Sequence, residues 1–213
     1  MLKLNPWLSI WLKPRDTIRA IKEYDPKHRF HVMCLIYGFL WMLSMSQTIS
    51  LGHFYGVPMI VIVSLILAWP VGYIMISVSS LLFLWVGKLF KGKGRYVEVR
   101  AAVAWANAPS LITIITWIIL MAAYGSRLFM ADKGAMDAEF GLVDVLFVVQ
   151  VIVAVWSMVI LIFGLSGAQG FSGGRAFGSF ILVLCIWIIF TILVMYIIAY
   201  CSQPAALALL ESF

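Results

Sequence analysis

Five long apolar runs decide what this chain can fold into. A transmembrane helix needs roughly 20 consecutive, mostly apolar residues, and five stretches of the sequence reach that length. The expected spans are residues 30–49, 57–86, 101–124, 142–165 and 174–201. Only 11% of the residues are charged, whereas a soluble domain carries about 25%. We therefore predict an all-α, polytopic membrane protein with five transmembrane helices.

The chain divides around these runs into three segments. Residues 1–29 are expected to form a cytoplasmic amphipathic segment, because their apolar side chains alternate with basic ones. Residues 30–201 form the five-span membrane domain, and residues 202–213 form a short external tail. We therefore predict a single domain with little mass outside the bilayer.

The placement of the basic residues predicts the orientation. Seven of the 15 Lys and Arg precede the first span, and five lie in the stretch 87–109, GKLFKGKGRYVEVRAAVAWANAP. Arg175 adds one more on the same side, whereas Arg127 and Lys133 lie on the other. Because Lys and Arg stay preferentially on the cytoplasmic side, we predict a cytoplasmic N-terminus and an external C-terminus. The predicted location is the plasma membrane, which is the inner membrane if the chain is bacterial.

The N-terminal segment predicts two short helices. Asn5 followed by Pro6 is typical of a helix start, and Pro14 is expected to end that helix and begin a second. Ile18 and Ile21 share one face of the second helix. This amphipathic pattern is typical of a helix that lies in the membrane interface. The alternative is that the segment packs on the cytoplasmic ends of the bundle.

The same charges predict the partners. The net charge of +6 is concentrated on one predicted side, which favours anionic lipid headgroups over nucleic acid. Gly170, Gly174 and Gly178 recur every four residues, a spacing that permits close packing against another membrane protein or a second copy. The basic residues expected to face lipid or a partner are Arg15, Arg19, Lys22, Lys88, Lys91, Lys93 and Arg95.

Polar residues inside the predicted spans are a second feature of interest. Gln47, Asn107, Asp144 and Gln150 are costly in lipid, so we expect them to face the bundle interior. They either form interhelical hydrogen bonds, worth about 0.6 kcal/mol each, or line a substrate path. Asp144 has the further alternative of lying at the external interface. Pro70 predicts a kink in the second span, which is either a hinge or only a matter of shape.

The sequence shows no enzymatic chemistry. The stretch 87–94 follows the phosphate-binding loop pattern as far as its lysine, but glycine replaces the Ser or Thr that holds magnesium. His28 and His31 share a helix face, yet Lys27 and Arg29 beside them disfavour a metal cation. The three cysteines lack the spacing of a metal or disulfide motif. We predict a protein that is not an enzyme and has no cofactor or metal.

Two glycine-rich connections carry a family resemblance. The stretch 87–109 and the stretch 164–176, GLSGAQGFSGGRA, resemble the signatures of bacterial members of the Yip family. That family is named for interaction with Rab-type (Ypt) GTPases. The start NPW…W…P…TIR is similar to the amphipathic start of bacterial members, so the resemblance covers nearly the whole chain. The positions that it assigns to the family motifs are Gly92, Gly94, Tyr96, Pro109, Gly164, Gly170, Phe171, Ser172, Arg175 and Ala176.

The resemblance implies a fold more than an activity. It implies five spans with the N-terminus inside, as the charges also predict. Eukaryotic members are associated with vesicle traffic between endoplasmic reticulum and Golgi, but this chain lacks their long acidic N-terminal region and their DLYGP motif. We therefore expect a non-enzymatic membrane protein that organises membrane or binds lipid or protein partners through a basic cytoplasmic face. The alternative function is a small transporter or channel that uses the polar interior.

Overall fold

Helices make up the regular structure of the described chain. The structure is a computed structural model, and it describes residues 5–130 and 141–210. Lys133 and the last three residues of the predicted external tail lie outside the described residues. Five helical segments are long and apolar enough to cross a membrane, which confirms the polytopic helical fold: Phe30–Thr48, Val57–Leu89, Ser110–Phe129, Leu142–Gln169 and Gly173–Ile197.

Two short helices begin the chain, as the sequence predicts. Helix α1 spans Pro6–Leu12 and helix α2 spans Pro14–Tyr24. The side-chain oxygen of Asn5 caps α1 by accepting a hydrogen bond of 3.2 Å from the amide of Trp7. Proline occupies the first position of each helix, where its missing N–H costs no intrahelical bond.

The apolar face of these helices packs against protein. Ile10, Ile18 and Ile21 are fully buried in the main core cluster, and α2 lies against α7 and α5. The second of the two sequence alternatives, packing on the bundle, therefore describes this face. Leu8 and Leu12 remain largely exposed, so α1 keeps an apolar edge of the kind that enters a membrane interface.

Helices α3 (Phe30–Thr48) and α4 (Val57–Leu89) form the closest pair. A 3-10 turn, η1 (Leu51–His53), lies between them. Gly38 and Gly72 bring the two backbones into contact, because a Cβ atom at either would overlap a carbonyl oxygen of the other helix. Helix α4 continues through Pro70 and exceeds the predicted 57–86 by one turn.

The structure interrupts the predicted third helix over 101–124. Helix α5 spans Tyr96–Trp105 and helix α6 spans Ser110–Tyr124, with a turn between them. Pro109 has no N–H to donate to the carbonyl of Trp105. The amide of Ala108 donates a hydrogen bond of 3.1 Å to that carbonyl instead. The chain therefore tightens into successive three-residue turns before α6 begins.

The last two helices are longer than predicted. A 3-10 segment, η2 (Gly125–Phe129), follows α6, and helix α7 spans Leu142–Gln169 rather than 142–165. The extra turn forms although it contains glycine, because Gly167 packs against the backbone of α2, with its Cβ position 2.8 Å from the carbonyl oxygen of Arg15. Helix α8 spans Gly173–Leu210 and takes in most of the predicted tail, where residues 205–210 are Ala and Leu, both strong helix formers.

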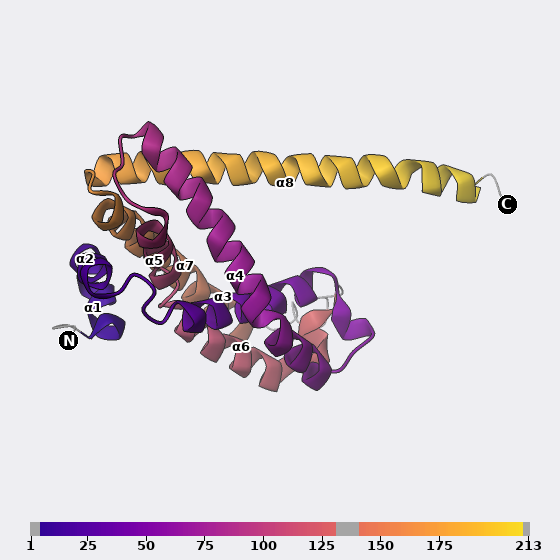
Figure 1. Cartoon of the computed structure of the whole chain (residues 1–213). Coiled ribbons are helices and arrows are strands. Elements are labelled where there is room, and N and C mark those ends of the chain that lie inside the picture. The colour runs from indigo at the N-terminus through magenta and orange to yellow at the C-terminus, as the bar shows by residue number, and fades with distance from the viewer. Residues whose placement is uncertain (1–4, 131–140, 211–213) are drawn as a thin grey trace.

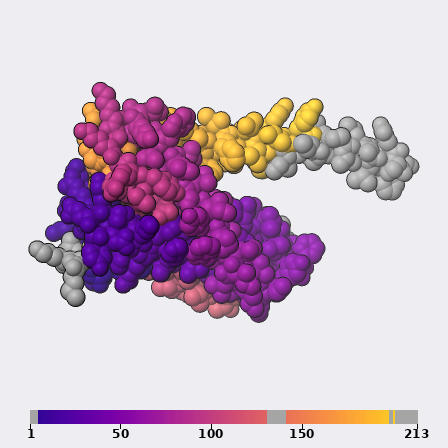
Figure 2. Space-filling view, in the orientation of Figure 1, coloured from indigo at the N-terminus to yellow at the C-terminus, as the bar shows by residue number. Residues whose placement is uncertain are grey.

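The elements separate into two ends (Figure 1). Helix α2, the end of α4, the start of α5, the end of α7 and the start of α8 lie together at one end, and η1 and η2 lie at the other. The later part of α8 extends past the other helices, as the yellow atoms of Figure 2 show. Its side chains there, such as Ile189 and Ile192, are largely exposed, as expected of a helix that faces lipid.

The contact between Gly38 and Gly72 generates a stability prediction. Gly72→Ala places a methyl group on the carbonyl oxygen of Cys34, so α3 and α4 must separate. Overpacking of this kind costs about 1–3 kcal/mol. We expect a lower unfolding temperature in detergent, measured by size-exclusion chromatography after heating. The control is Gly174→Ala in α8, where a Cβ meets nothing within 4 Å. Equal stability of the two variants would contradict the packing.

Candidate functional site: the basic face

The two glycine-rich connections meet at one buried glutamine. Gln169, at the end of α7, is almost fully buried, and its Nε2 donates a hydrogen bond of 2.9 Å to the carbonyl of Phe83 in α4. The backbone carbonyl of Gln169 accepts a hydrogen bond of 3.0 Å from the backbone amide of Lys93. Gln169 therefore fastens the basic connection between α4 and α5 to the bundle.

Three glycines make room for this glutamine. A Cβ atom at Gly87 or Gly92 would overlap the Gln169 side chain, and one at Gly94 would lie 2.8 Å from the carbonyl oxygen of Ala168. These positions exclude larger residues for steric reasons. Two of the three, Gly92 and Gly94, are among the predicted family-motif positions, and the structure gives both a packing role.

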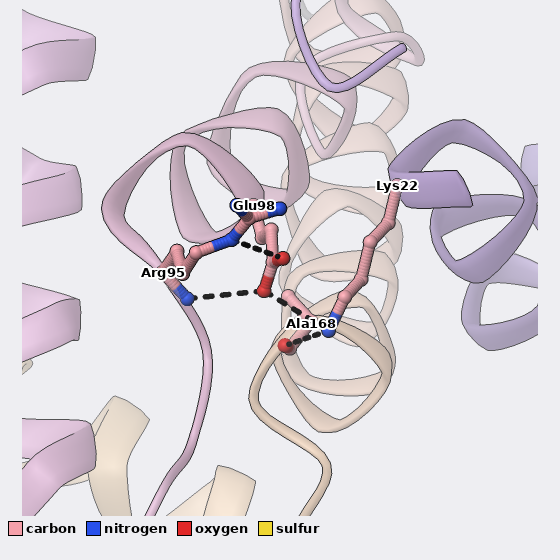
Figure 3. A network of polar contacts seen from close by, with 4 residues as sticks. All are labelled: Lys22, Arg95, Glu98 and Ala168. Atoms are coloured by element: carbon pink, nitrogen blue, oxygen red, sulfur yellow. Dashed lines mark hydrogen bonds and ion pairs between the residues drawn. The ribbon is translucent and has the colours of Figure 1, made fainter. Parts of the chain in front are cut away.

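A buried carboxylate holds α2, the connection and α7 together. Figure 3 shows Lys22 reaching from α2 to Glu98 at the start of α5 and to the carbonyl of Ala168 at the end of α7. The Lys22 Nζ lies 2.9 Å from Oε2 of Glu98 and 3.3 Å from the Ala168 oxygen. Arg95 donates to the same carboxylate through its Nε and its amide, each at 3.0 Å. The side chain of Glu98 is only 4% exposed.

These contacts set the charge state of Glu98. Burial of the carboxylate raises its pKa, but the hydrogen bonds from the Arg95 amide and from the Lys22 and Arg95 side chains, with the Lys22 charge, outweigh burial. The pKa of Glu98 therefore lies below its usual range. Glu98 is ionised at neutral pH, and its negative charge is fully occupied by protein donors.

Around this buried network the basic side chains remain exposed. We define the basic face as seven exposed residues on α2, the α4 end, the connection and the α8 start: Arg15, Arg19, Lys88, Lys91, Lys93, Arg95 and Arg175. Arg95 is exposed but pairs with Glu98, and Lys22, which is partly buried, pairs with Glu98 as well. Asp16, Glu23 and Asp25 are the exposed carboxylates of this end among the described residues. The face therefore keeps a positive excess.

Two of the remaining motif positions at this end, Gly164 and Phe171, are buried, and Gly170 is exposed. Gly164 lies in van der Waals contact with Ile18 and with Ala102 of α5. Gly170 ends α7 at a positive φ of 70°, a left-handed conformation that glycine adopts without strain. Phe171 is buried and its carbonyl accepts a hydrogen bond of 2.7 Å from Ser166 Oγ.

The last motif positions lie at helix starts. Ser172 immediately precedes α8, and its carbonyl accepts from the amide of Ala176 at 3.1 Å, as that of an N-cap residue does. Ala176 is fully buried. Pro109 ends the turn between α5 and α6, far along the chain from the basic face.

Arg100 differs from the other cations of the connection. Its guanidinium lies 4.1 Å from the ring centroid of Phe30 and 5.4 Å from that of Tyr96. It is half-buried, and its Nε has no hydrogen-bond partner among the described residues. Cation–π contacts of this kind contribute about 0.5–2 kcal/mol. Arg100 therefore packs α5 against α3 instead of extending the basic face.

Sequence reasoning missed Glu98 and Gln169. The signal for Glu98 was present, since it is the one carboxylate in a stretch with five cations and stands three residues after Arg95, the spacing of a capping box. Gln169 gives no such signal, because its partners Phe83 and Lys93 are more than 70 residues away in the chain.

The polar residues of the spans do not converge on one place. Gln47 donates to the carbonyl of Leu128 in η2 at 3.0 Å, which ties the end of α3 to that segment. Asn107 and Gln150 line one cavity between α6 and α7. Asp144 is exposed in the first turn of α7, where its charge suits the helix dipole. The expectation of an interior position is thus wrong for Asp144, and the alternative, a position at the external interface, stays a prediction.

The two histidines have aromatic neighbours. His28 stacks on Trp105, whose Nε1 donates to the His28 carbonyl at 3.3 Å. His31 Nδ1 accepts from Trp69 Nε1 at 3.1 Å. Among residues 5–130 and 141–210, no group of three His, Cys, Asp or Glu is close enough to hold a metal ion.

Comparison with known proteins gives one match. A family model described as the Yip1 domain matches residues 8–197, a range that includes α2, both glycine-rich connections and the five apolar segments. No curated protein and no solved structure matches the chain.

The Glu98 network predicts a pH dependence of stability. Because the folded-state pKa of Glu98 is lowered, its contribution is fully present above the ordinary pKa of about 4.3 and is lost as the pH falls through the lower folded value. We expect Glu98→Gln to cost about 1–3 kcal/mol at neutral pH and to flatten this acid dependence. Thermal unfolding in detergent at a series of pH values measures both effects.

The matched control for this prediction is Glu23→Gln, which neutralises an exposed carboxylate on α2. It should leave stability and its pH profile close to those of the parent chain. Because Glu98 anchors Lys22, Glu98→Gln should also speed protease cleavage between α2 and α3. Unchanged cleavage and unchanged acid stability would contradict the assigned role of Glu98.

Proposed function

The chain belongs to the Yip1 domain family of integral membrane proteins, and we propose from this premise that it organises membrane by binding partners through the basic face. The partners are anionic lipid headgroups or an acidic segment of another protein. The role is non-enzymatic. One observation supports the proposal above the others: the buried carboxylate at this end already has its donors, Lys22 and Arg95, and the other six cations of the basic face remain exposed.

The strength of such a face comes from several weak contacts. Each Lys or Arg near an anionic leaflet contributes about 1 kcal/mol, and the attraction falls off within a Debye length. That length is about 8 Å at physiological ionic strength, so the cations must lie close to the bilayer to act. Binding through this face should therefore weaken as salt is added.

A defined shape distinguishes this face from a flexible basic loop. Gln169 fastens the connection at Lys93 and Glu98 fastens it at Arg95, and the glycines allow the close approach. Because the cations are carried by a packed segment, little ordering entropy is lost on binding. This favours recognition of a partner of definite shape over general attraction to any negative surface.

The proposed orientation places the basic face in the cytoplasm. The face lies at one end of the bundle, and η1 and η2 lie at the other (Figure 1). The positive-inside tendency favours the basic end on the cytoplasmic side. The proposed membrane is the plasma membrane, or the inner membrane of a bacterium.

A transport path receives less support. Gln47 lies at the far end of α3 and bonds to η2, away from the cavity that Asn107 and Gln150 line. The amide nitrogens of Asn107 and Gln150 donate to Val103 and Thr116 inside the bundle. The bonds of Gln47 and Gln150 join different elements, and that of Asn107 closes a turn on its own segment. Structural hydrogen bonds therefore account for these residues more directly than a path across the membrane does.

The basic face predicts a loss of anionic lipid binding. Replacing Lys88, Lys91, Lys93 and Arg175 with glutamine removes four exposed cations and spares Arg95, which holds Glu98. At about 1 kcal/mol each, we expect at least a tenfold weaker affinity for phosphatidylglycerol. The measurement is native mass spectrometry of the detergent-solubilised protein with added phosphatidylglycerol or phosphatidylcholine.

The contrasting variant replaces Gln47, Asn107 and Gln150 with leucine and leaves the basic face unchanged. It should bind phosphatidylglycerol like the parent chain. If the glutamine variant kept full binding and full activity in a deletion phenotype, while the leucine variant lost that activity, the transport alternative would replace the proposal.

The orientation has its own test. Single cysteines placed by Lys91→Cys and Lys133→Cys, in a background without the three native cysteines, should differ in labelling by an impermeant maleimide on spheroplasts or intact cells. We expect Lys133→Cys to react from outside and Lys91→Cys to react only after the membrane is opened, because cations stay on the cytoplasmic side. Labelling of both from outside would refute the five-span orientation.

A further inference from the structure

Two cavities adjoin in the seam between α6 and α7. The first has a volume of about 450 Å³ and is lined by the start of α6 and the middle of α7. The second has a volume of about 310 Å³ and extends toward α3, α4 and α8, where Tyr37 and Phe180 line it. Asn107, Ala154 and Ser157 line both cavities, so the two share a wall.

The lining of these cavities includes polar side chains but no charged ones among the described residues. Asn107, Ser110, Thr113, Gln150 and Ser157 contribute amides and hydroxyls to the first cavity. No Asp, Glu, Lys, Arg or His lines either one among the residues that the structure describes. An ion or a phosphate would have no countercharge here, and an unpaired charge in an apolar surrounding is very costly. The chemistry favours a neutral ligand.

Some of this hydrogen-bonding capacity is unused. Asn107 Nδ2 donates to the carbonyl of Val103 and Gln150 Nε2 donates to Thr116 Oγ1, each at 2.9 Å. Within the described chain, neither amide oxygen accepts a hydrogen bond. Ser157 Oγ is buried and has no hydrogen-bond partner there either. A ligand hydroxyl would donate to one of these acceptors, and a ligand carbonyl would accept from the Ser157 hydroxyl.

The helix break places polar backbone at the same seam. Ala106 and Asn107, in the turn between α5 and α6, line the second cavity, and Ser110 at the start of α6 lines the first. Non-helical backbone within a membrane is tolerated where protein buries it or where it lines a cavity. The interruption of the third span thus contributes to the cavity wall.

The seam is accessible from the lipid side. Val151 and Ala154 line the first cavity and are exposed, and the neighbouring Ile152 and Val155 of α7 are more than half exposed. These apolar side chains face the hydrocarbon of a bilayer. A ligand would therefore enter sideways from the membrane rather than from water.

We propose that the two adjoining cavities bind one neutral lipid that carries hydroxyl and carbonyl groups, of the diacylglycerol type. Its hydroxyl donates to the free amide oxygen of Asn107, and its carbonyls accept from hydroxyl groups of the lining such as that of Ser157. Its chains leave along the exposed face of α7. The first cavity falls within the roughly 300–1,000 Å³ of typical small-molecule sites. This site is separate from the basic face.

The test is photolabelling of the full chain in phosphatidylcholine vesicles. The probe is a clickable diacylglycerol with a diazirine near the glycerol group. We expect label on peptides that cover residues 106–116 and 150–157, and competition by unlabelled diacylglycerol. Photoreactive phosphatidylglycerol should label these peptides at least fivefold less, because the lining holds no cation.

Two variants address the shared wall. Ala154→Phe fills it and should lower the labelling of the seam at least fivefold, whereas Ile192→Phe adds a ring on the exposed later part of α8 and should leave labelling unchanged. Ser157→Ala removes one hydroxyl with almost no change in volume, so it tests the polar contact even if Ala154→Phe fails to fold. We expect a several-fold loss of labelling for Ser157→Ala.

Three results would overturn the proposal. The first is labelling that neither Ala154→Phe nor Ser157→Ala reduces. The second is equal labelling of the seam by the phosphatidylglycerol probe, which would indicate general exposure to lipid. The third is crosslinking of the seam to a second copy of the chain with no competition by diacylglycerol, which would make it a dimer contact.

Discussion

Close contact between backbones holds this bundle together. Lipid chains are as apolar as leucine, so two helices in a bilayer gain no hydrophobic free energy when they meet. Dispersion contacts and a few polar bonds must supply the attraction, and both need the helices to approach closely. Gly38 against Gly72, Gly167 against α2 and Gly94 against α7 supply that approach. The glycines of this chain are therefore packing surfaces more than flexible points.

Polar bonds then decide where the close contacts form. Glu98 receives donors from α2 and from the start of α5, and Lys22 in turn bonds to the end of α7. Breaking one partner of such a buried pair leaves an uncompensated charge, so the pair favours one arrangement over others of similar packing. Gln169 does the same between α7 and α4 without any charge. These two side chains make the end of the bundle that carries the basic face a single packed unit.

Sequence patterns predicted the features that depend on neighbours along the chain. The five apolar runs, the Asn5 cap and the restart at Pro14 each follow from local residue types, and the structure confirms them. The features that the sequence patterns did not predict depend on contacts across the fold. Gly167 is helical although glycine is a weak helix former, and α2 packs on it. The Glu98 and Gln169 bonds likewise join elements far apart in the chain. Periodicity carries no information about such contacts.

Helix α5 connects the two proposed sites. It begins at the capping contact between Arg95 and Glu98, beside the basic face, and it ends at the break before Asn107, which lines both seam cavities. Apart from residues of its first turn and Arg100, it is buried throughout. A buried helix of this kind cannot shift at one end without moving its packing at the other, because protein interiors are close-packed. The position of α5 therefore sets the geometry of the basic face and of the seam together.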